Sequence, residues 1–205
     1  MPFAPWLLKR LTHGAGYNRA CNKRFPSVKI IPRDTLWHGP PPIATPYRSW
    51  LTDPGSLTQR IAERCPHLRV EVVFQGLRHA NRDERFLVGN GPRSRMLVRE
   101  VYLYCGDTPV VFAHSVLRPA DLHGVWRAVS GLGSRPLGGA LFADPRVRRG
   151  PLRQRKLGPR HELYHRALSV LPGVNGPLWA RRSLFVLHKS PILVTEVFLP
   201  GIQEL

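Results

Sequence analysis

The chain has 205 residues, of which 42% are hydrophobic and 21% charged, and its formal net charge at pH 7 is +18. This balance excludes a chain that is disordered throughout, and the length suits one main domain with an extension. The positive charge fits a nucleic acid, an anionic membrane surface or an acidic substrate as partner. Because the basic residues are mostly arginines spread along the chain, the charge alone selects none of these partners.

Residues 1–48 are rich in Pro, Arg and Lys and show little periodicity, whereas clear element signals begin near residue 49. We therefore predict a basic, Pro-rich N-terminal extension over 1–48 and one domain over 49–205. The first eleven residues contain Pro2 and Pro5 and lack a small-residue cleavage site, so they do not resemble a signal peptide. No stretch approaches the roughly 20 apolar residues of a membrane-spanning helix. These features predict a cytoplasmic protein.

The three cysteines, Cys21, Cys65 and Cys105, are odd in number and lack C-x-x-C spacing. Such a set argues against a disulfide framework and against a thiolate zinc site, and it is typical of a reducing compartment. We therefore expect no disulfide framework in the fold.

The domain is expected to open with a short helix from Ser56 to Arg64, because Ser56 and Gln59 have the spacing of a capping box. Runs rich in β-branched and aromatic residues then predict strands. The predicted strands cover residues 69–76, 85–88, 97–105, 110–117, 183–188 and 192–199. Short turns join the third strand to the fourth and the fifth to the sixth, so these pairs are expected to be antiparallel hairpins.

Two further helices are expected between the fourth and fifth strands, over residues 119–129 and 161–171, each closed by glycine or by a Pro-Gly pair. The prediction is an α+β fold, with a single antiparallel sheet and helices on one side. The densest basic run, residues 146–160, is interpreted as a solvated face.

Two charged residues fall on the apolar faces of predicted strands. Alternation places Arg99 on the same face as Leu97, Val101 and Leu103, and Glu196 on the same face as neighbouring apolar residues of the last strand. Burying an unpaired ion is costly, so each group needs a partner or a ligand. Either the two residues form a structural salt bridge or reach water at an edge, or they line a small anion site. In that site Arg99 would clamp a carboxylate and Glu196 would accept a hydrogen bond from a hydroxyl.

The sequence H-E-L-Y-H at residues 161–165 matches H-E-x-x-H, in which two histidines one helical turn apart can hold zinc beside a general base. The longer metzincin pattern is absent, since Leu168 stands where that pattern requires glycine. The alternative is an exposed amphipathic helix that buries Leu163, Ala167 and Leu168. We favour the amphipathic helix.

Gly138 and Gly139 precede an apolar turn within residues 136–142, where backbone N–H groups can approach a small anion closely. A tight turn that enters a short helix explains the same pattern equally well. The sequence contains no P-loop motif and presents no obvious nucleophile.

Five blocks of the sequence resemble successive blocks of the chorismate pyruvate-lyase family, in the same order and at similar spacing. They are SLTQR at 56–60, LVREV at 97–101, RPLG at 135–138, WARRS at 179–183 and LVTEVFLP at 193–200. The resemblance covers about residues 49–200 and leaves the extension out.

This resemblance implies an antiparallel sheet of about six strands with flanking helices around an internal ligand site. It also implies a lyase, without cofactor or metal, that cleaves chorismate into 4-hydroxybenzoate and pyruvate, for ubiquinone biosynthesis. Arg99 resembles the carboxylate-binding arginine of the family, and Glu196 resembles its buried glutamate near the substrate hydroxyl; these two are the candidate catalytic residues. Leu137 and Leu57 resemble residues that line the substrate pocket.

Two other classes of function stay open. A non-catalytic domain of the same fold that senses a small molecule would also bury an arginine and a glutamate around its ligand. Such regulators carry a DNA-binding helix-turn-helix, which residues 1–48 do not resemble. An Arg-rich nucleic-acid binder would show aromatic residues among the basic ones and a recognition module, and neither is visible. The expected partners are therefore chorismate and 4-hydroxybenzoate, with no specific nucleic acid, and the protein is expected to be a monomer.

Overall fold

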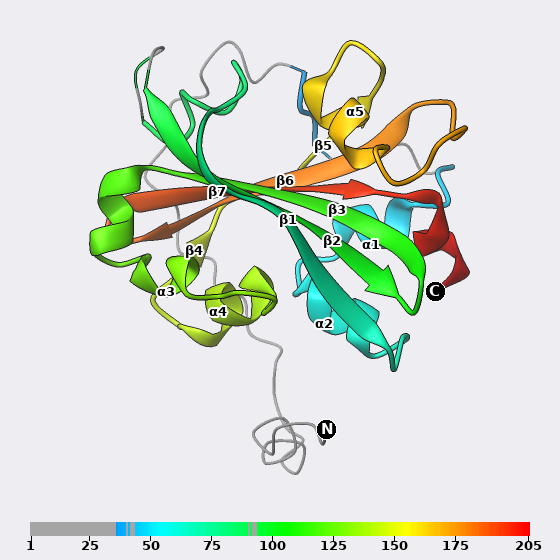
Figure 1. The fold of residues 1–205 in the computed structure, drawn as a ribbon, viewed down its shortest axis with the longest axis horizontal. Coiled ribbons are helices and arrows are strands. Elements are labelled where there is room, and N and C mark those ends of the chain that lie inside the picture. Colours follow the sequence, from blue (N-terminus) through cyan, green and yellow to red (C-terminus); the bar gives the residue numbers. More distant parts are fainter. Residues whose placement is uncertain (1–35, 40, 42–43, 90, 92–93) are drawn as a thin grey trace.

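The computed structural model describes residues 36–39, 41, 44–89, 91 and 94–205 (Figure 1). Most of the predicted extension, residues 1–35, lies outside the described residues. The described residues form one twisted sheet with short helices packed on it, so the predicted α+β class is confirmed.

Seven strands form a single antiparallel sheet in the order β1-β2-β3-β7-β6-β4, and β5 also pairs with β6. The strands are β1 Leu68–His79, β2 Arg95–Cys105, β3 Thr108–Leu117, β4 Arg148–Arg149, β5 Arg153–Leu157, β6 Leu178–Leu187 and β7 Ser190–Phe198. Both predicted hairpins are present. Gly106 turns β2 into β3 with φ of 58°, and His188 and Lys189 turn β6 into β7 with φ of 47° and 68°.

Helices cover the two faces of the sheet unequally. The helical elements are α1 Arg48–Thr52, α2 Leu57–Ala62, η3 Pro119–His123, α3 Arg127–Ser130, α4 Leu137–Ala143, α5 Glu162–Ala167 and η4 Pro200–Glu204. Figure 1 shows α2, α3 and α4 on one side of the sheet and α5 on the other, whereas helices had been expected on one side only. No helix in the described part of the chain is long and apolar enough to cross a membrane.

Strand alternation explains which side chains meet which helices. On β2, Val101 and Leu103 pack with α1 and α2, while Tyr102 on the opposite face packs with Leu163 and Ala167 of α5. A further cluster joins α3 and α4 to the other end of the first face, through residues such as Trp126, Leu141 and Phe185. The helices on the first face therefore form two groups, which meet where α2 approaches α4. Ser56 caps α2 by accepting a hydrogen bond from the backbone N–H of Gln59, as its spacing predicts.

Two predicted elements differ in the structure. Residues 85–88 lie in successive turns instead of a strand, because the backbone N–H groups of Leu87 and Val88 both donate to the carbonyl of Glu84. Val88 is still buried, against Met96 and Val98, which accounts for its apolar signal. The predicted helix over 119–129 is divided into η3 and α3.

The basic run over 146–160 is only partly the solvated face that we expected. It forms β4 and β5, which pair with β6, so alternate side chains turn inward. Arg148 and Lys156 are exposed, whereas Gln154 and Leu157 are buried and Arg149 is half-buried. The pairing of these strands with β6 determines which of the side chains are exposed, and the charge pattern of the sequence does not show that pairing.

Cys65 and Cys105 form a disulfide, which overturns the expectation from cysteine number and spacing. Cys65 follows α2, and the next strand begins at Leu68, whose pairing partner on β2 is Cys105. This register brings the two Cα atoms to 5.8 Å although 40 positions separate them in the chain. The disulfide ties α2 to the end of β2.

Candidate functional site

A cavity lies between the first face of the sheet and the helices α2 and α4, one from each of the two groups. The free volume inside it is about 40 Å³, and the space between its walls, counted together with the adjoining solvent, is about 600 Å³. Its floor is formed by inward-facing side chains of β2, β3, β6 and β7, and its cover by the first turns of α2 and α4. The residues that line it include Leu57, Arg99, Ser115, Leu137, Gly138, Arg149, Ser183 and Glu196.

Arg99, on β2, is a cavity residue whose surface is only 2% exposed. Its Nη2 donates to the carbonyl oxygens of Gly133 at 2.9 Å and Arg135 at 3.1 Å, in the segment that leads into α4. Its buried Nε has no hydrogen-bond partner among the described residues, and no acidic side chain of that set pairs with it. Burial lowers the pKa of Arg99 below its ordinary value. The guanidinium therefore keeps hydrogen-bonding capacity for an anion.

Glu196, on β7, faces the same cavity and has its own counter-ion. Its carboxylate accepts a hydrogen bond at 2.5 Å from Nε of Arg181, the residue paired with it on β6. Arg181 is fully buried, and its Nη1 donates to the carbonyls of Trp50 and Asp53 beside α1. The salt bridge between Arg99 and Glu196 that strand alternation left open does not occur in the described part of the chain.

Leu57 and Leu137 cover the cavity from the two groups of helices. They are the first residues of α2 and α4, and they are 3% and 7% exposed. The two helices approach closely, since a Cβ added at Gly138 would lie 3.1 Å from Oγ of Ser56 and 3.3 Å from Oγ1 of Thr58. Of the two interpretations of Gly138 and its neighbour, the structure contains the turn into a short helix, and the glycine permits close helix packing.

Arg149, on β4, is a cavity residue that the sequence analysis missed. Its Nε donates to Oγ of Ser183 at 3.0 Å, and its Nη1 donates to the carbonyl of Pro54 at 2.5 Å. Its guanidinium lies 5.3 Å from the ring of Phe185. Burial is the main reason why the pKa of Arg149 falls to about 10, so the side chain is still cationic at neutral pH.

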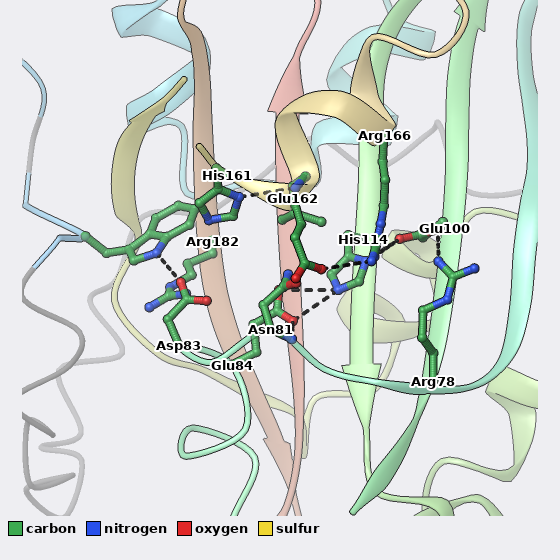
Figure 2. Close-up of polar contacts among 12 residues, drawn as sticks. Arg78, Asn81, Asp83, Glu84, Glu100, His114, His161, Glu162, Arg166 and Arg182 are labelled. Atoms are coloured by element: carbon green, nitrogen blue, oxygen red, sulfur yellow. Dashed lines mark hydrogen bonds and ion pairs between the residues drawn. The ribbon is translucent and has the colours of Figure 1, made fainter. Parts of the chain in front are cut away.

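A second group of buried charges lies on the opposite face of the sheet (Figure 2). His114 on β3 lies between two glutamates, with Nε2 at 3.3 Å from Glu84 and Nδ1 at 3.0 Å from Glu100. Glu100 also accepts hydrogen bonds from Arg166 of α5 at 2.8 Å and from Arg78 of β1 at 3.2 Å. We call these five residues the His114 cluster. Its carboxylates have cationic partners within the protein.

The H-E-x-x-H segment contributes the N-terminus of α5. Nδ1 of His161 accepts a hydrogen bond from the backbone N–H of Leu163, and Nε2 of His165 lies 2.6 Å from the carbonyl of Pro159. Glu162 is exposed and pairs with Arg166. The described residues contain no group of three or more His, Cys, Asp or Glu side chains that could hold a metal ion. The structure contains the amphipathic helix rather than a zinc-binding constellation among these residues.

The profile of the chorismate lyase family matches residues 31–204. The chain belongs to this family. Curated relatives named probable chorismate pyruvate-lyase include a protein of Nitrosomonas europaea, 51% identical over 180 residues that cover 87% of this chain and all of the relative. Another, from Nitrosospira multiformis, is 52% identical over 82% of this chain and 95% of the relative.

Two solved structures share the fold of this chorismate lyase family member at low sequence identity. The PhnF C-terminal domain has a TM-score of 0.52 at 14% identity, covering 66% of this chain and 85% of that chain. The effector domain of PhnF from Mycobacterium smegmatis has a TM-score of 0.50 at 14% identity, covering 72% and 90%. At this identity the likeness shows a common fold and carries no information about the ligand.

The same cavity brings together all four residues that the sequence predicts for the site of this chorismate lyase family member. They are Leu57, Arg99, Leu137 and Glu196. Arg181 was missed, although alternation with Trp179 and Ser183 would have placed it on the inner face of its strand. Arg149 was missed because the basic run around it was interpreted as solvated.

Proposed function

We propose that the cavity is an active site in which chorismate is cleaved into 4-hydroxybenzoate and pyruvate. Membership of the chorismate lyase family makes the chain a lyase that acts on chorismate. The proposal adds the products and the residues. The observation that carries it is the pair formed by the buried Arg99 and the half-buried Glu196, which share one cavity without neutralising each other.

The substrate chemistry matches these two groups. Chorismate carries one carboxylate on its ring and another on its enolpyruvyl ether, and a ring hydroxyl beside the ether. A guanidinium can receive a carboxylate through two parallel hydrogen bonds, so Arg99 binds the ring carboxylate, supported by backbone N–H groups near Leu137. Glu196, held by Arg181, accepts a hydrogen bond from the ring hydroxyl. Leu57 and Leu137 supply apolar contact with the ring.

The reaction needs little chemistry from the protein. The bond between the ring carbon and the ether oxygen breaks, the neighbouring ring carbon loses its hydrogen, and the ring becomes aromatic as 4-hydroxybenzoate. The released enolpyruvate takes up a proton at its methylene carbon and becomes pyruvate. Because aromatisation provides the driving force, the residues of the cavity act mainly by positioning the substrate and by stabilising its charges. Glu196 either orients the hydroxyl or assists the proton movement.

The remaining assignments are also proposals. We propose that the enzyme works in the cytoplasm as a monomer, that its product enters ubiquinone biosynthesis, and that the positive charge serves no specific nucleic acid. The division into an extension over 1–48 and a domain over 49–205 stays a prediction. It is supported by the cavity, whose lining residues all lie between Leu57 and Glu196.

Incubating the purified protein with chorismate tests the proposal. We expect 4-hydroxybenzoate and pyruvate to appear in equal amounts, at a rate that is unchanged by a chelator, since the cavity chemistry is assigned to side chains alone. Chorismate that binds without being consumed would instead favour the non-catalytic sensor. Pyruvate accompanied by a different aromatic product would contradict the assignment of the reaction.

A further inference from the structure

The charges that face the cavity do not balance within the protein. Glu196 is paired with Arg181, and no acidic side chain among the described residues lies at ion-pair distance from Arg99 or Arg149, although the charges of Glu196 and Asp53 act on Arg149 from further away. Arg149 donates from Nε and Nη1 to hydroxyl and carbonyl oxygens only, and its Nη2 makes no hydrogen bond within that set. A half-buried cation with unused donors and no direct ion pair suits an anionic ligand.

Arg99 and Arg149 stand at opposite ends of the cavity floor, with Glu196 between them. The sheet order places β3, β7 and β6 between β2 and β4, so four interstrand steps separate the two backbones. At the usual strand spacing, this amounts to about 19 Å between the backbones from which the two side chains extend. One row of paired residues crosses the floor from Arg99 to Ser183, and Arg149 hydrogen-bonds to Ser183.

The order of these side chains matches the order of polar groups in chorismate. The ring carboxylate and the hydroxyl lie at opposite ring positions, the ether lies beside the hydroxyl, and the enolpyruvyl carboxylate extends beyond it. We propose that Arg149 binds the enolpyruvyl carboxylate while Arg99 binds the ring carboxylate. This assignment rests on the proposed function, because it divides that substrate between two arginines.

The assignment separates the two products. After cleavage, 4-hydroxybenzoate retains only the ring carboxylate, while the carboxylate held by Arg149 leaves with pyruvate. Arg149 therefore contributes to the binding of chorismate and not to the binding of 4-hydroxybenzoate. A purely structural role makes the opposite prediction: Arg149 also ties Pro54 and Gly55, which precede α2, to β4, and losing that tie would disturb both ligands.

The test compares the two ligands on Arg149→Met, Arg99→Met and the matched control Arg148→Met, whose side chain on the same strand is exposed. For Arg149→Met we expect kcat/KM with chorismate to fall about 10- to 100-fold, the range for losing a charged hydrogen bond. The Kd for 4-hydroxybenzoate, measured by calorimetry, should change less than about threefold. Arg99→Met should weaken both ligands, and Arg148→Met neither.

Several outcomes would overturn the assignment. Equal losses for both ligands in Arg149→Met would show a structural role, and an unchanged kcat/KM with chorismate would show no role. Should Arg149→Met fail to fold, Arg149→Lys keeps the cation without the planar fork. We then expect a smaller fall in kcat/KM with chorismate and again little change in the Kd for 4-hydroxybenzoate. Equal losses for both ligands in Arg149→Lys would also contradict the assignment. Wild-type protein that neither consumes chorismate nor binds 4-hydroxybenzoate would instead remove the proposed function itself.

Discussion

The two faces of the sheet both bury charged side chains, but they satisfy them differently. On the cavity face, Arg99 and Arg149 donate only to carbonyl and hydroxyl oxygens among the described residues. On the other face, in the His114 cluster, cations and carboxylates contact each other directly (Figure 2). The two sets of charges lie on opposite faces of the same part of the sheet, because His114 lies on β3 between two cavity residues, Ala113 and Ser115.

The difference indicates which buried charges hold the fold and which await a ligand. Removing one member of a buried ion pair is costly, and the intact pair has no net charge with which to attract an anionic ligand. A buried ion without a counter-ion is a net cost to the folded protein until a ligand supplies one, so its retention points to binding. Changes in the His114 cluster should therefore act on stability, and changes at the cavity arginines should act on activity.

The largest expected effect is on stability. Replacing Glu84 with Ala leaves His114 buried without one of its two partners and should lower the free energy of unfolding by about 3–5 kcal/mol. Urea unfolding measures the change, and kcat/KM with chorismate, measured well below the unfolding midpoint, should stay near the wild-type value. A variant that is as stable as wild type but inactive would reverse the roles of the two faces.

Arg99 should show the opposite behaviour. Replacing it with Ala removes the partner of a substrate carboxylate and should cost about 2–5 kcal/mol in kcat/KM, most of it as lost binding. Lys at this position should rescue poorly, because it keeps the charge but not the planar fork. The free energy of unfolding should hold steady or rise, since a buried cation without a counter-ion is removed. A large loss of stability with normal activity would show that Arg99 only ties the segment around Gly133 to the sheet.

The two faces also differ in how far sequence could predict them. Alternation alone identified Arg99 and Glu196 as inward-facing, because each lies within a long strand with a clear period of two. Arg149 lies in a two-residue strand, which is too short to show a period. Glu84 lies in turns, and its contact with His114 joins positions 30 residues apart. Which buried charges become partners depends on how segments that are distant in the sequence pack together. The local pattern of residues along one strand does not show this.

The disulfide was not predicted, because it too depends on how distant segments pack. It joins two elements that border the cavity. It anchors α2, whose first residue Leu57 covers the cavity, to β2. Breaking it should lower the free energy of unfolding by about 2–4 kcal/mol, since the closed loop spans 40 positions. Urea unfolding with and without reductant measures this. The reduced wild type should match the double variant C65S/C105S, which reductant should leave unchanged; equal stability of oxidised and reduced wild type would show that the disulfide contributes nothing.

The smallest expected effect is a pH dependence that belongs to the His114 cluster. Burial alone would raise the pKa of Glu84, but the charge and hydrogen bond of His114 outweigh it and lower the value to about 2. Burial alone would lower the pKa of His114, but the charge of Glu84 and the hydrogen bonds of both glutamates raise it to about 9. The folded pKa of His114 exceeds its unfolded value near 6.5, so its contribution is complete below pH 6.5 and is lost as pH rises through 9.

The contribution of Glu84 has the opposite sign, because its folded pKa lies below its unfolded value near 4.5. That contribution is complete above pH 4.5 and is lost as pH falls towards 2. The cluster should therefore stabilise the fold most between about pH 4.5 and 6.5. Free energies of unfolding measured between pH 6 and 9.5 should decline in wild type. In Glu84→Gln, which keeps the shape but not the charge, the decline should be smaller and should end at lower pH, because the folded pKa of His114 moves towards its unfolded value. Parallel curves for the two proteins would assign the alkaline loss to groups outside the cluster.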